Sequence, residues 1–428
     1  MDASRIRAVD PEVAAAIERE RRRQDESLQL IASENHVSPA VMAAQGSVLT
    51  NKYAEGYPDR RYYAGCEAID VIEQRAIDRA RALWGADHVN VQPHSGTQAN
   101  MAVYHAALQP GDRILSLSLE HGGHLSHGHR VNFTGKLYDI EHYHLDETTG
   151  RLDYDTIADR AVETEPDIIV SGFSAYPRII DWEAIQEAAE AVDAYHLADM
   201  AHISGLVAAG EHPTPVGIAD FVTGSTHKTI RAGRGGMVLC DEEHAEMIDA
   251  AVFPGGQGGP LMHNIAGKAV GFAEALEPSF TSYIEQVVAN ARALARTLTD
   301  GGLHLVTGGT DTHLVLADLS KSHPELTGKQ AEEALESVGI VLNKNTIPGE
   351  ERSPFVTSGI RIGTPAVTSR GLSEQDVEVI AECILDVLDA PEDTSVADEV
   401  SQRVDELVEA HPLYEETGAS TLWPRLQD

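Results

Sequence analysis

Lysine is scarce in this chain, and one lysine stands where an amine nucleophile would be expected. The sequence has seven lysines among its 32 basic residues, so arginine supplies most of the positive charge. Arginine can replace lysine as a surface cation, but its guanidinium stays protonated and cannot act as an amine nucleophile. Lys228 follows the apolar pair Phe221-Val222 and lies next to His227. It is therefore a candidate for Schiff-base chemistry, although taken alone an ordinary loop lysine is the commoner interpretation.

Two further groups precede Lys228 at the ends of predicted strands. Ser95-Gly96-Thr97 follows Val89–Val91 and opens a helix, where free N–H groups can bind a phosphate, although a plain N-cap has the same residues. Asp199 follows Tyr195–Ala198, and a carboxylate at a buried strand end needs a cationic or hydrogen-bonding partner. Ligands of open α/β sheets collect at such strand ends. A phosphate cradle, a carboxylate and an amine together indicate pyridoxal 5'-phosphate, with the amine holding the aldehyde and the carboxylate pairing with the pyridine nitrogen.

Four histidines, at positions 121, 124, 127 and 129, form a cluster between these groups. Histidine is a common metal ligand, but no pair has the i,i+4 spacing of a helical site. Gly122-Gly123 would instead let the backbone approach a flat ligand. We favour an aromatic contact with the cofactor and predict no metal.

Other segments supply groups for binding and proton transfer. Gly255–Pro260 is rich in glycine and forms either a plain turn or a second set of N–H groups for a phosphate. Arg361 offers a planar fork for a substrate carboxylate, although a solvated arginine is the commoner case. One short segment provides hydroxyls and a possible acid or base: Tyr53, Glu55, Tyr62 and Tyr63.

The segments that position these residues alternate between helical and strand patterns. From about residue 70 to 280 the alternation predicts an α/β fold with a mostly parallel sheet. A long helix follows, with an apolar face from Ile284 to Leu298, and Gly301-Gly302 ends it. A charged helix is expected from residue 11 to about 30. We therefore expect an N-terminal helical arm (1–30), a large domain (31–280) and a small C-terminal α/β domain (281–428).

Composition limits the partners and the compartment. The formal net charge of -36 argues against nucleic acid or an anionic membrane as a partner. Such a charge repels itself unless salt screens it, and together with the scarcity of lysine it suggests a salt-rich cytoplasm. The three cysteines have neither disulfide-framework nor zinc-site spacing, which fits a reducing cytoplasm. We expect no secretory signal and no membrane span.

Eight segments stand in an order known from one enzyme family: IASEN (31–35), KYAEGYPDRRYYAGCEAID (52–70), QPHSGTQAN (92–100), HGGHLSHG (121–128), ADMAHISGLVAAG (198–210), STHKTIRAGRGG (225–236), VFPGGQGGPLMH (252–263) and SPFVTSGIRIGTPA (353–366). Through these segments the chain resembles serine hydroxymethyltransferase from about residue 30 to 370.

The resemblance implies pyridoxal-phosphate fold type I, the α/β fold of aspartate aminotransferase, in a homodimer or dimer of dimers with shared active sites. It also implies reversible interconversion of serine and glycine through an external aldimine and a quinonoid. The one-carbon unit would pass to a reduced pterin, for which tetrahydrofolate is the leading candidate and a methanopterin-type relative the other. Retro-aldol release of formaldehyde and direct attack by the pterin both remain open.

Carried over by motif, the resemblance implies a role for each cofactor residue. Lys228 would form the internal aldimine, Asp199 would pair with the pyridine nitrogen, and His124 would stack on the ring. His202 would lie near the phenolic oxygen. The phosphate would be held by Ser95, Gly96 and Thr97, with Tyr53, Gly258 and Gly259 reaching it from the partner subunit. The remaining members of the implied cofactor and catalytic set are Ser174, Ser225 and His227.

The substrate residues follow in the same way. Ser33 and Arg361 would bind the carboxylate of the amino acid, with Tyr63 nearby. Glu55 would be the acid or base that handles the protons of the serine hydroxyl and the pterin. The residues implied to line the pterin site are Leu119, Leu125 and Asn345.

Some positions depart from the family pattern, and two alternatives remain. Gly224 and Ser225 stand where threonines are usual, and Glu120 and Arg178 are the departures expected to alter the pterin entrance or subunit contacts. The first alternative is a pterin-independent pyridoxal-phosphate aldolase acting on β-hydroxy amino acids. The second is a non-catalytic binding protein on the same fold, which the intact candidate catalytic residues disfavour.

Overall fold

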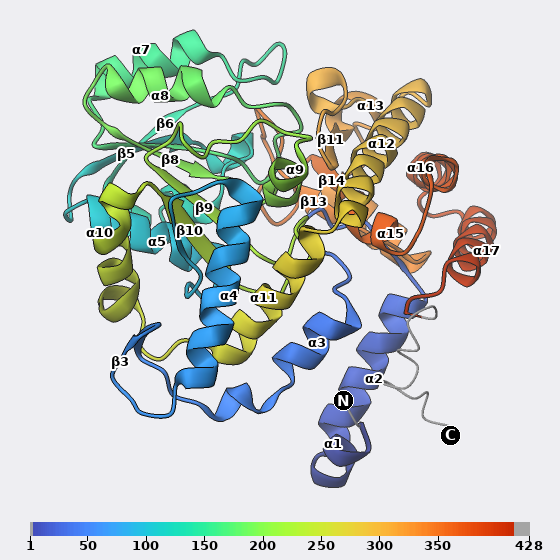
Figure 1. Ribbon diagram of the computed structural model, residues 1–428. Helices are drawn as coiled ribbons and strands as arrows, with labels where there is room; N and C mark the ends of the chain where they lie inside the picture. The colour runs from blue at the N-terminus through green and yellow to red at the C-terminus, as the bar shows by residue number, and fades with distance from the viewer. Residues whose placement is uncertain (1–2, 415–428) are drawn as a thin grey trace.

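A seven-stranded sheet dominates the computed structural model, which describes residues 3–414 (Figure 1). Its strands, in spatial order, are β4 (His88–Asn90), β10 (Gly236–Cys240), β9 (Phe221–Ser225), β8 (Tyr195–Asp199), β7 (Ile168–Ser171), β5 (Arg113–Leu117) and β6 (Asp139–Tyr143). Only β10 runs against its neighbours. The expected α/β fold with a mostly parallel sheet is confirmed, and the carboxyl ends of β4, β8 and β9 meet at one edge.

Alternate residues of each strand enter different cores, because successive side chains point to opposite faces of a sheet. Ile169 and Val222 belong to a core covered by α4 (Glu67–Trp84), α7 (Tyr154–Thr164), α8 (Trp182–Glu190) and α11 (Met262–Ala275). Ile168 and Phe221 belong to the core on the other face, covered by α5 (Gly96–Ala107) and α10 (Ala245–Ala250). Burial on both faces explains the nearly continuous apolar strands.

A further core forms around α12 (Pro278–Asp300), whose C-cap is Gly301 as the sequence predicts. It includes the antiparallel sheet β11-β14-β13, made of Leu314–Asp318, Gly359–Gly363 and Asn343–Asn345. The helices packed on this core are α14 (Gly328–Ser337), α15 (Pro365–Ser369), α16 (Glu374–Asp389) and α17 (Thr394–Ala410). The helix α17 begins inside the acidic stretch from residue 390 to 399.

The N-terminal segment consists of α1 (Ala3–Val9) and α2 (Pro11–Asp25), with Asp10 capping α2. The helix ends at Asp25 rather than near residue 30, because Leu28 and Leu30 are buried in the α12 core and β1 (Leu28–Gln29) pairs in parallel with β12 (Ile340–Val341). Residues 1–2 and 415–428 of the expected domains lie outside the described part of the chain. The shorter elements are α3 (Pro39–Gln45), β2 (Gly56–Tyr57), β3 (Arg60–Arg61), α6 (Thr134–Leu137), α9 (Ser204–Ala209) and α13 (Leu319–Ser322).

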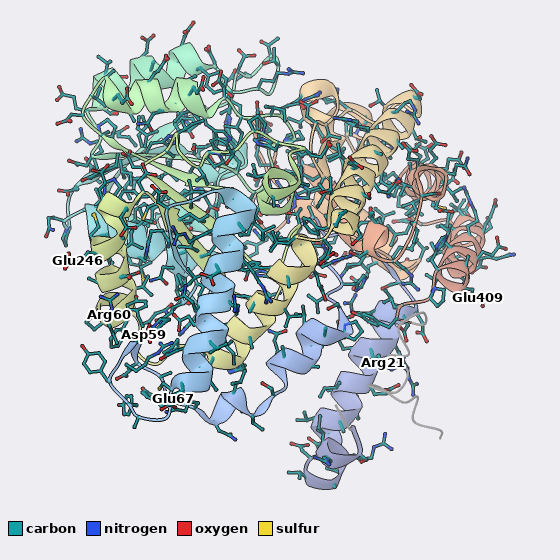
Figure 2. The ribbon with its side chains drawn as sticks, in the orientation of Figure 1. Arg21, Asp59, Arg60, Glu67, Glu246 and Glu409 are labelled. Carbon is teal, nitrogen blue, oxygen red and sulfur yellow. The ribbon has the colours of Figure 1, made fainter. Side chains whose placement is uncertain are left out.

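Charged side chains project from the periphery of the molecule. Glu67, Glu246 and Glu409 are exposed and lie at the outer edge of the ribbon (Figure 2). None of the helices in residues 3–414 is both long and apolar enough to cross a membrane. The large negative charge is therefore carried in part by carboxylates that salt can screen.

Candidate active site

A cavity of about 250 Å³ lies where β8, β9 and the N-terminus of α5 meet. Asp199 ends β8 and pairs in register with Thr223 of β9, so Lys228, shortly after β9, emerges at the same edge. The cavity brings together ten of the predicted site residues: Ser95, Gly96, Thr97, His124, Ser174, Asp199, His202, Ser225, His227 and Lys228. It is also lined by His127, Phe173, Ala201 and Arg234, which the sequence did not single out for a role.

Lys228 faces a setting that favours a free amine. Burial lowers the pKa of its ammonium to about 8, the Asp199 carboxylate opposes this shift, and Arg361 and Arg234 add to it. A larger share of the amine is therefore unprotonated at neutral pH than for an exposed lysine. The side-chain amide of Asn35 donates to the Lys228 carbonyl oxygen at 2.9 Å, which fixes the backbone that carries the amine.

Asp199 is held by a set of donors from distant parts of the chain. Its Oδ2 accepts hydrogen bonds from His127 Nε2 at 2.9 Å and Asn100 Nδ2 at 2.8 Å, and its Oδ1 accepts one from the Ala201 N–H at 2.9 Å. Burial would raise the pKa of the Asp199 carboxyl, but the hydrogen bonds from His127 and Asn100 outweigh burial and lower it. The carboxylate is thus kept ionised inside the cavity.

The sequence patterns predict no role for His127 or Asn100. His127 belongs to the noted histidine cluster, and Asn100 stands one turn after Gly96 on α5. Asn100 also donates to Ser126 Oγ at 2.9 Å and accepts from Thr223 Oγ1 at 2.6 Å. The spacing of four residues from Gly96 to Asn100 could have indicated that Asn100 faces the site, because residues so spaced share one face of a helix.

The phosphate cradle is the first turn of α5. Ser95 is the N-cap, and its Oγ accepts from the Gln98 N–H at 3.2 Å. The first N–H groups of a helix have no carbonyl partner within that helix, so those of Gly96 and Thr97 are available to an anion. A Cβ added to Gly96 would lie 2.8 Å from Ser225 Oγ, so only glycine lets this hydroxyl approach the cradle.

Two histidines that line the cavity, His124 and His202, are neutral. Burial lowers the pKa of His124 to about 4, and burial holds that of His202 well below its usual value. His124 Nδ1 accepts from the Ser126 N–H at 3.2 Å, which leaves the proton on Nε2. His202 stacks on His313, with the ring centroids 5.6 Å apart. Neutral rings can lie against a flat ligand without repelling the cation at Lys228.

Arg361, on β14, contacts Ser174, a residue of the cavity lining. It is 9% exposed, and its NH1 donates to the Ser174 carbonyl at 2.7 Å while its Nε donates to Asn343 Oδ1 at 3.1 Å. Burial lowers the pKa of the guanidinium to about 10, so it remains a cation at neutral pH. The α12 core thus supplies a charged group next to a residue that lines the cavity.

Five other predicted residues gather in a separate cluster and do not line the cavity: Tyr53, Glu55, Tyr63, Gly258 and Gly259. The Tyr53 and Tyr63 rings are 5.3 Å apart, and a Cβ on Gly259 would meet the Tyr53 ring at 3.0 Å. A hydrogen bond with Glu55 raises the pKa of the Tyr53 hydroxyl. The tyrosine rings are largely exposed.

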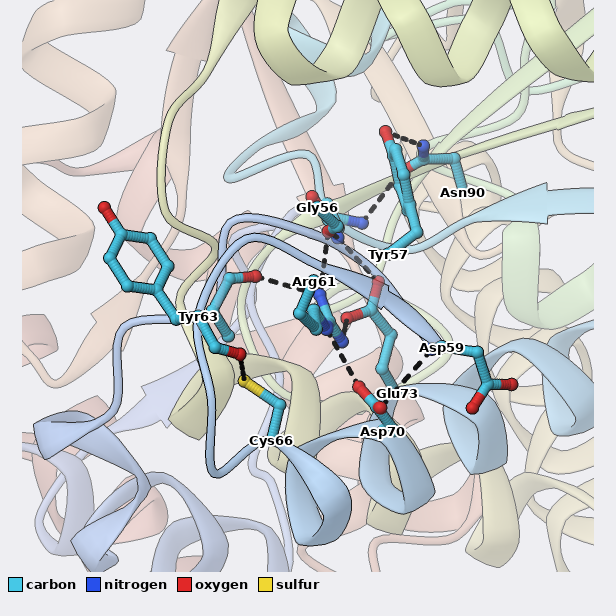
Figure 3. A network of polar contacts seen from close by, with 11 residues as sticks. Gly56, Tyr57, Asp59, Arg61, Tyr63, Cys66, Asp70, Glu73 and Asn90 are labelled. Atoms are coloured by element: carbon cyan, nitrogen blue, oxygen red, sulfur yellow. Dashed lines mark hydrogen bonds and ion pairs between the residues drawn. The ribbon is translucent and has the colours of Figure 1, made fainter.

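The backbone on both sides of Glu55 is clamped by Arg61 (Figure 3). Its NH1 donates to the Ala54 carbonyl at 2.9 Å and to the Gly56 carbonyl at 2.7 Å. The same guanidinium pairs with Glu73 at 2.5 Å and with Asp70 at 2.8 Å. Arg61 and Glu73 are almost fully buried, so the clamp is rigidly held.

The remaining predicted residues lie outside the cavity lining: Ser33, Leu119, Leu125 and Asn345. Leu125 is 43% exposed, and Asn345 Nδ2 donates to the Thr346 carbonyl at 2.7 Å. Arg178, expected at an entrance or subunit contact, binds Asp311 at 3.1 Å and the Thr307 carbonyl at 2.7 Å within the same chain.

The departure at Gly224 has a packing reason. A Cβ at this position would lie 2.7 Å from the terminal methyl carbon of Met237. Met237 and Met200 fill the space that a larger side chain at this position would occupy.

The residues around the cavity fit pyridoxal phosphate. An ionised carboxylate has about four acceptor positions, and Asp199 uses three of them, which leaves one for a ring N–H. The cradle of α5 suits a phosphate, and Lys228 supplies an amine of lowered pKa. The donor set therefore matches the phosphate, the pyridine nitrogen and the aldehyde of this cofactor.

Comparison with known proteins agrees with this fit. The family model "Serine hydroxymethyltransferase" matches residues 6–384. The chain is 66% identical to the serine hydroxymethyltransferase of Halorubrum lacusprofundi over 97% of its own length and 100% of that protein. It is 65% identical to that of Natronomonas pharaonis (97% and 98% of the two chains) and 66% identical to that of Haloarcula marismortui (96% and 99%).

Proposed function

The chain belongs to the serine hydroxymethyltransferase family, and we propose from this premise which of its residues perform the pyridoxal-phosphate-dependent interconversion of serine and glycine. The proposal rests chiefly on one observation: the amine of Lys228, the ionised Asp199 and the first turn of α5 face a single cavity. No one of these groups is specific alone, whereas their convergence fits one cofactor.

When bound, pyridoxal phosphate supplies an aldehyde for amines and a ring that withdraws electrons from the bonds of the amino acid Cα. Lys228 would hold the cofactor through its aldehyde, because its amine has a lowered pKa. Asp199, which stays ionised, would accept the N–H of the ring nitrogen. His124 would lie against the ring, while Ser95, Gly96 and Thr97 would bind the phosphate. The other contacts of the cofactor come from Ser174, His202, Ser225 and His227.

Arg361 binds the carboxylate of the amino acid and sets its orientation. Its Nε and one NH1 proton are already used, so its NH2 group and second NH1 proton remain for the substrate. By fixing the carboxylate, Arg361 would fix the orientation of the Cα–Cβ bond of serine that is cleaved. Ser33 and Tyr63 assist this binding.

The acid or base of the reaction is Glu55, and we place it in the active site of a partner subunit. Glu55, Tyr53, Gly258 and Gly259 cluster together but do not line the cavity of their own chain. The exposed Tyr53 and Tyr63 rings offer apolar surface for a second copy of the chain. A homodimer with shared sites, alone or paired into a tetramer, would complete both cavities.

We propose tetrahydrofolate as the acceptor of the one-carbon unit, bound along Leu119, Leu125 and Asn345. We also propose a division into an arm (1–30), a large domain (31–280) and a small domain (281–428). The separate cores around the seven-stranded sheet and around α12 support it. The three cysteines are buried and free, which supports a cytoplasmic location.

Absorbance spectra of the purified protein in high salt test these assignments. Wild type should carry a visible cofactor band, and glycine with tetrahydrofolate should add a band at longer wavelength that needs both compounds. Lys228→Arg should lack covalently held cofactor while keeping the fold, and normal turnover in it would refute the role of Lys228. A cofactor band without any folate response would favour a methanopterin-type acceptor or the aldolase. Glu55→Gln should bind serine but lose pterin-dependent turnover.

A further inference from the structure

Lys268 is a buried cation for which the proposed function has no role. It lies in α11 and is 1% exposed. Its Nζ donates to three backbone carbonyls: Val91 at 2.6 Å, Gly236 at 2.9 Å and Pro93 at 3.0 Å. A lysine ammonium has three N–H donors, so each is used. Burial of an ammonium costs free energy, and the hydrogen bonds to these three carbonyls offset that cost.

The three carbonyls belong to the two backbone segments beside the phosphate cradle. Val91 and Pro93 lie between β4 and α5, and Gly236 is the first residue of β10. The Gly236 N–H donates to the Pro93 carbonyl at 2.9 Å. A Cβ on Gly236 would meet the Ser95 carbonyl oxygen at 2.3 Å, so β10 and the cradle are in close contact. The Lys268 ammonium therefore links the segment between β4 and α5 to β10. Its contact with the Pro93 carbonyl lies two residues before Ser95.

We propose that Lys268 is a positioning residue that fixes the backbone from Val91 to Ser95 on β10, and thereby aims the N–H groups of Gly96 and Thr97 at the cofactor phosphate. The proposal rests on the phosphate role proposed for this cradle. Without the ammonium, three carbonyls would face one another with no shared donor, and their repulsion would move the loop that carries Ser95.

The site is shaped for an ammonium rather than a guanidinium. A Cβ on Gly235 would lie 2.2 Å from Lys268 Cε, so the channel around the side chain has no spare width. Burial lowers the pKa of Lys268 to about 7, while Glu73 acts in the opposite direction. The three carbonyl acceptors favour the protonated form, since a neutral amine would direct a lone pair at one of them.

Binding of pyridoxal phosphate and of pyridoxal, which lacks the phosphate, separates positioning from general stability. Apoprotein of wild type and Lys268→Met is titrated with each compound in high salt, and binding is followed by quenching of tryptophan fluorescence. Lys268→Met should bind pyridoxal phosphate about tenfold or more weakly, since hydrogen bonds to charged groups contribute on this scale, with its affinity for pyridoxal unchanged.

Phe272→Leu is the matched control. Phe272 is a fully buried residue of the same helix that packs on Trp84, with ring centroids 5.4 Å apart, and its side chain has no hydrogen-bond donor to offer the carbonyls that Lys268 binds. This variant should be less stable to urea but keep the preference for the phosphorylated compound. Equal losses of affinity for both compounds in Lys268→Met would overturn the proposal.

Two further variants complete the test. If Lys268→Met does not fold, Gly235→Ala displaces the same side chain, and an unchanged preference in it would overturn the proposal. Ser95→Ala tests the cradle itself. Loss of the preference in Ser95→Ala but not in Lys268→Met would refute only the role of Lys268, whereas no preference in wild type would refute the cradle and with it the proposal.

Discussion

Removal of Arg61 should separate the stability of this protein from its catalysis. Arg61→Met leaves Glu73 buried without its cation and removes the donors to the carbonyls on either side of Glu55. The side chains of Arg61 and Glu73 are 3% and 1% exposed. Breaking such a buried pair costs about 3–5 kcal/mol, a large part of the roughly 5–15 kcal/mol by which most domains are stable.

The loss of stability should also depend on pH. Burial already raises the pKa of Glu73 in the wild type, against the effect of Arg61. Without Arg61, the pKa of Glu73 in the folded state rises further above its value in the unfolded state. At low pH the carboxyl is then protonated, and its burial without a cation costs little. The penalty therefore grows as pH rises through the folded pKa. Urea unfolding of Arg61→Met at acid and neutral pH should show this trend relative to wild type.

The double variant Arg61→Met/Glu73→Gln distinguishes the two functions of the clamp. Glutamine removes the unpaired charge and can still accept from Gln92, which donates to Glu73 at 2.7 Å, so much of the free energy of unfolding should return. The carbonyls beside Glu55 still lack their donor, and a misplacement of about 1 Å can cost about a hundredfold in rate.

We therefore expect kcat for serine cleavage to stay low in both variants, with the stability of the double variant largely restored. Glu73→Gln alone is the control, because it keeps Arg61 on both carbonyls. Recovery of kcat in parallel with the urea midpoint would refute a positioning role for Arg61 and leave it a purely structural residue.

Three other outcomes follow from the site and the composition. The rate at which apoprotein captures pyridoxal phosphate should rise as pH increases through about 8, because the pKa of the Lys228 ammonium is lowered to that value; a rise only near the ordinary lysine value would contradict this setting. His127→Leu should raise the pKa of Asp199 and weaken binding of pyridoxal about tenfold, by loss of a hydrogen bond to a charged group; unchanged affinity would remove His127 from the site. The urea midpoint should increase from dilute buffer to about 1 M KCl, where the Debye length is about 3 Å, and equal midpoints would contradict screening of the net charge of -36.

The sequence predicted the residues that follow strands better than the residues that support them. Asp199 ends one apolar strand and Lys228 closely follows the next, and parallel strands end at one edge of a sheet, so their convergence followed from local pattern. These predictions needed only the order of strands along the chain and the type of the residue near each strand end. The pairing of β4 with β10, which brings Ser95 to the same edge, is seen only in the structure.

The supporting residues depend on contacts between distant segments. His127 reaches Asp199 across 72 positions and Asn100 across 99, and neither spacing has a pattern that a single sequence reveals. The early end of α2 has the same cause, since β1 is a two-residue strand whose partner is β12. Pairing this short carries no periodicity, and the charged helical pattern before it extends without a clear stop.

The positions of the lysines connect composition with chemistry. Lys321, Lys329 and Lys344 each pair with a carboxylate, a task that a guanidinium also performs. Lys228 and Lys268 differ, since burial lowers the pKa of each and each lies next to the cradle or the cavity. Position 228 needs a side chain that can lose its proton. Position 268 needs a compact group with three donors directed at three carbonyls. In a chain that relies on arginine for charge, a lysine in the interior is therefore more informative than one at the surface, because arginine can supply neither property.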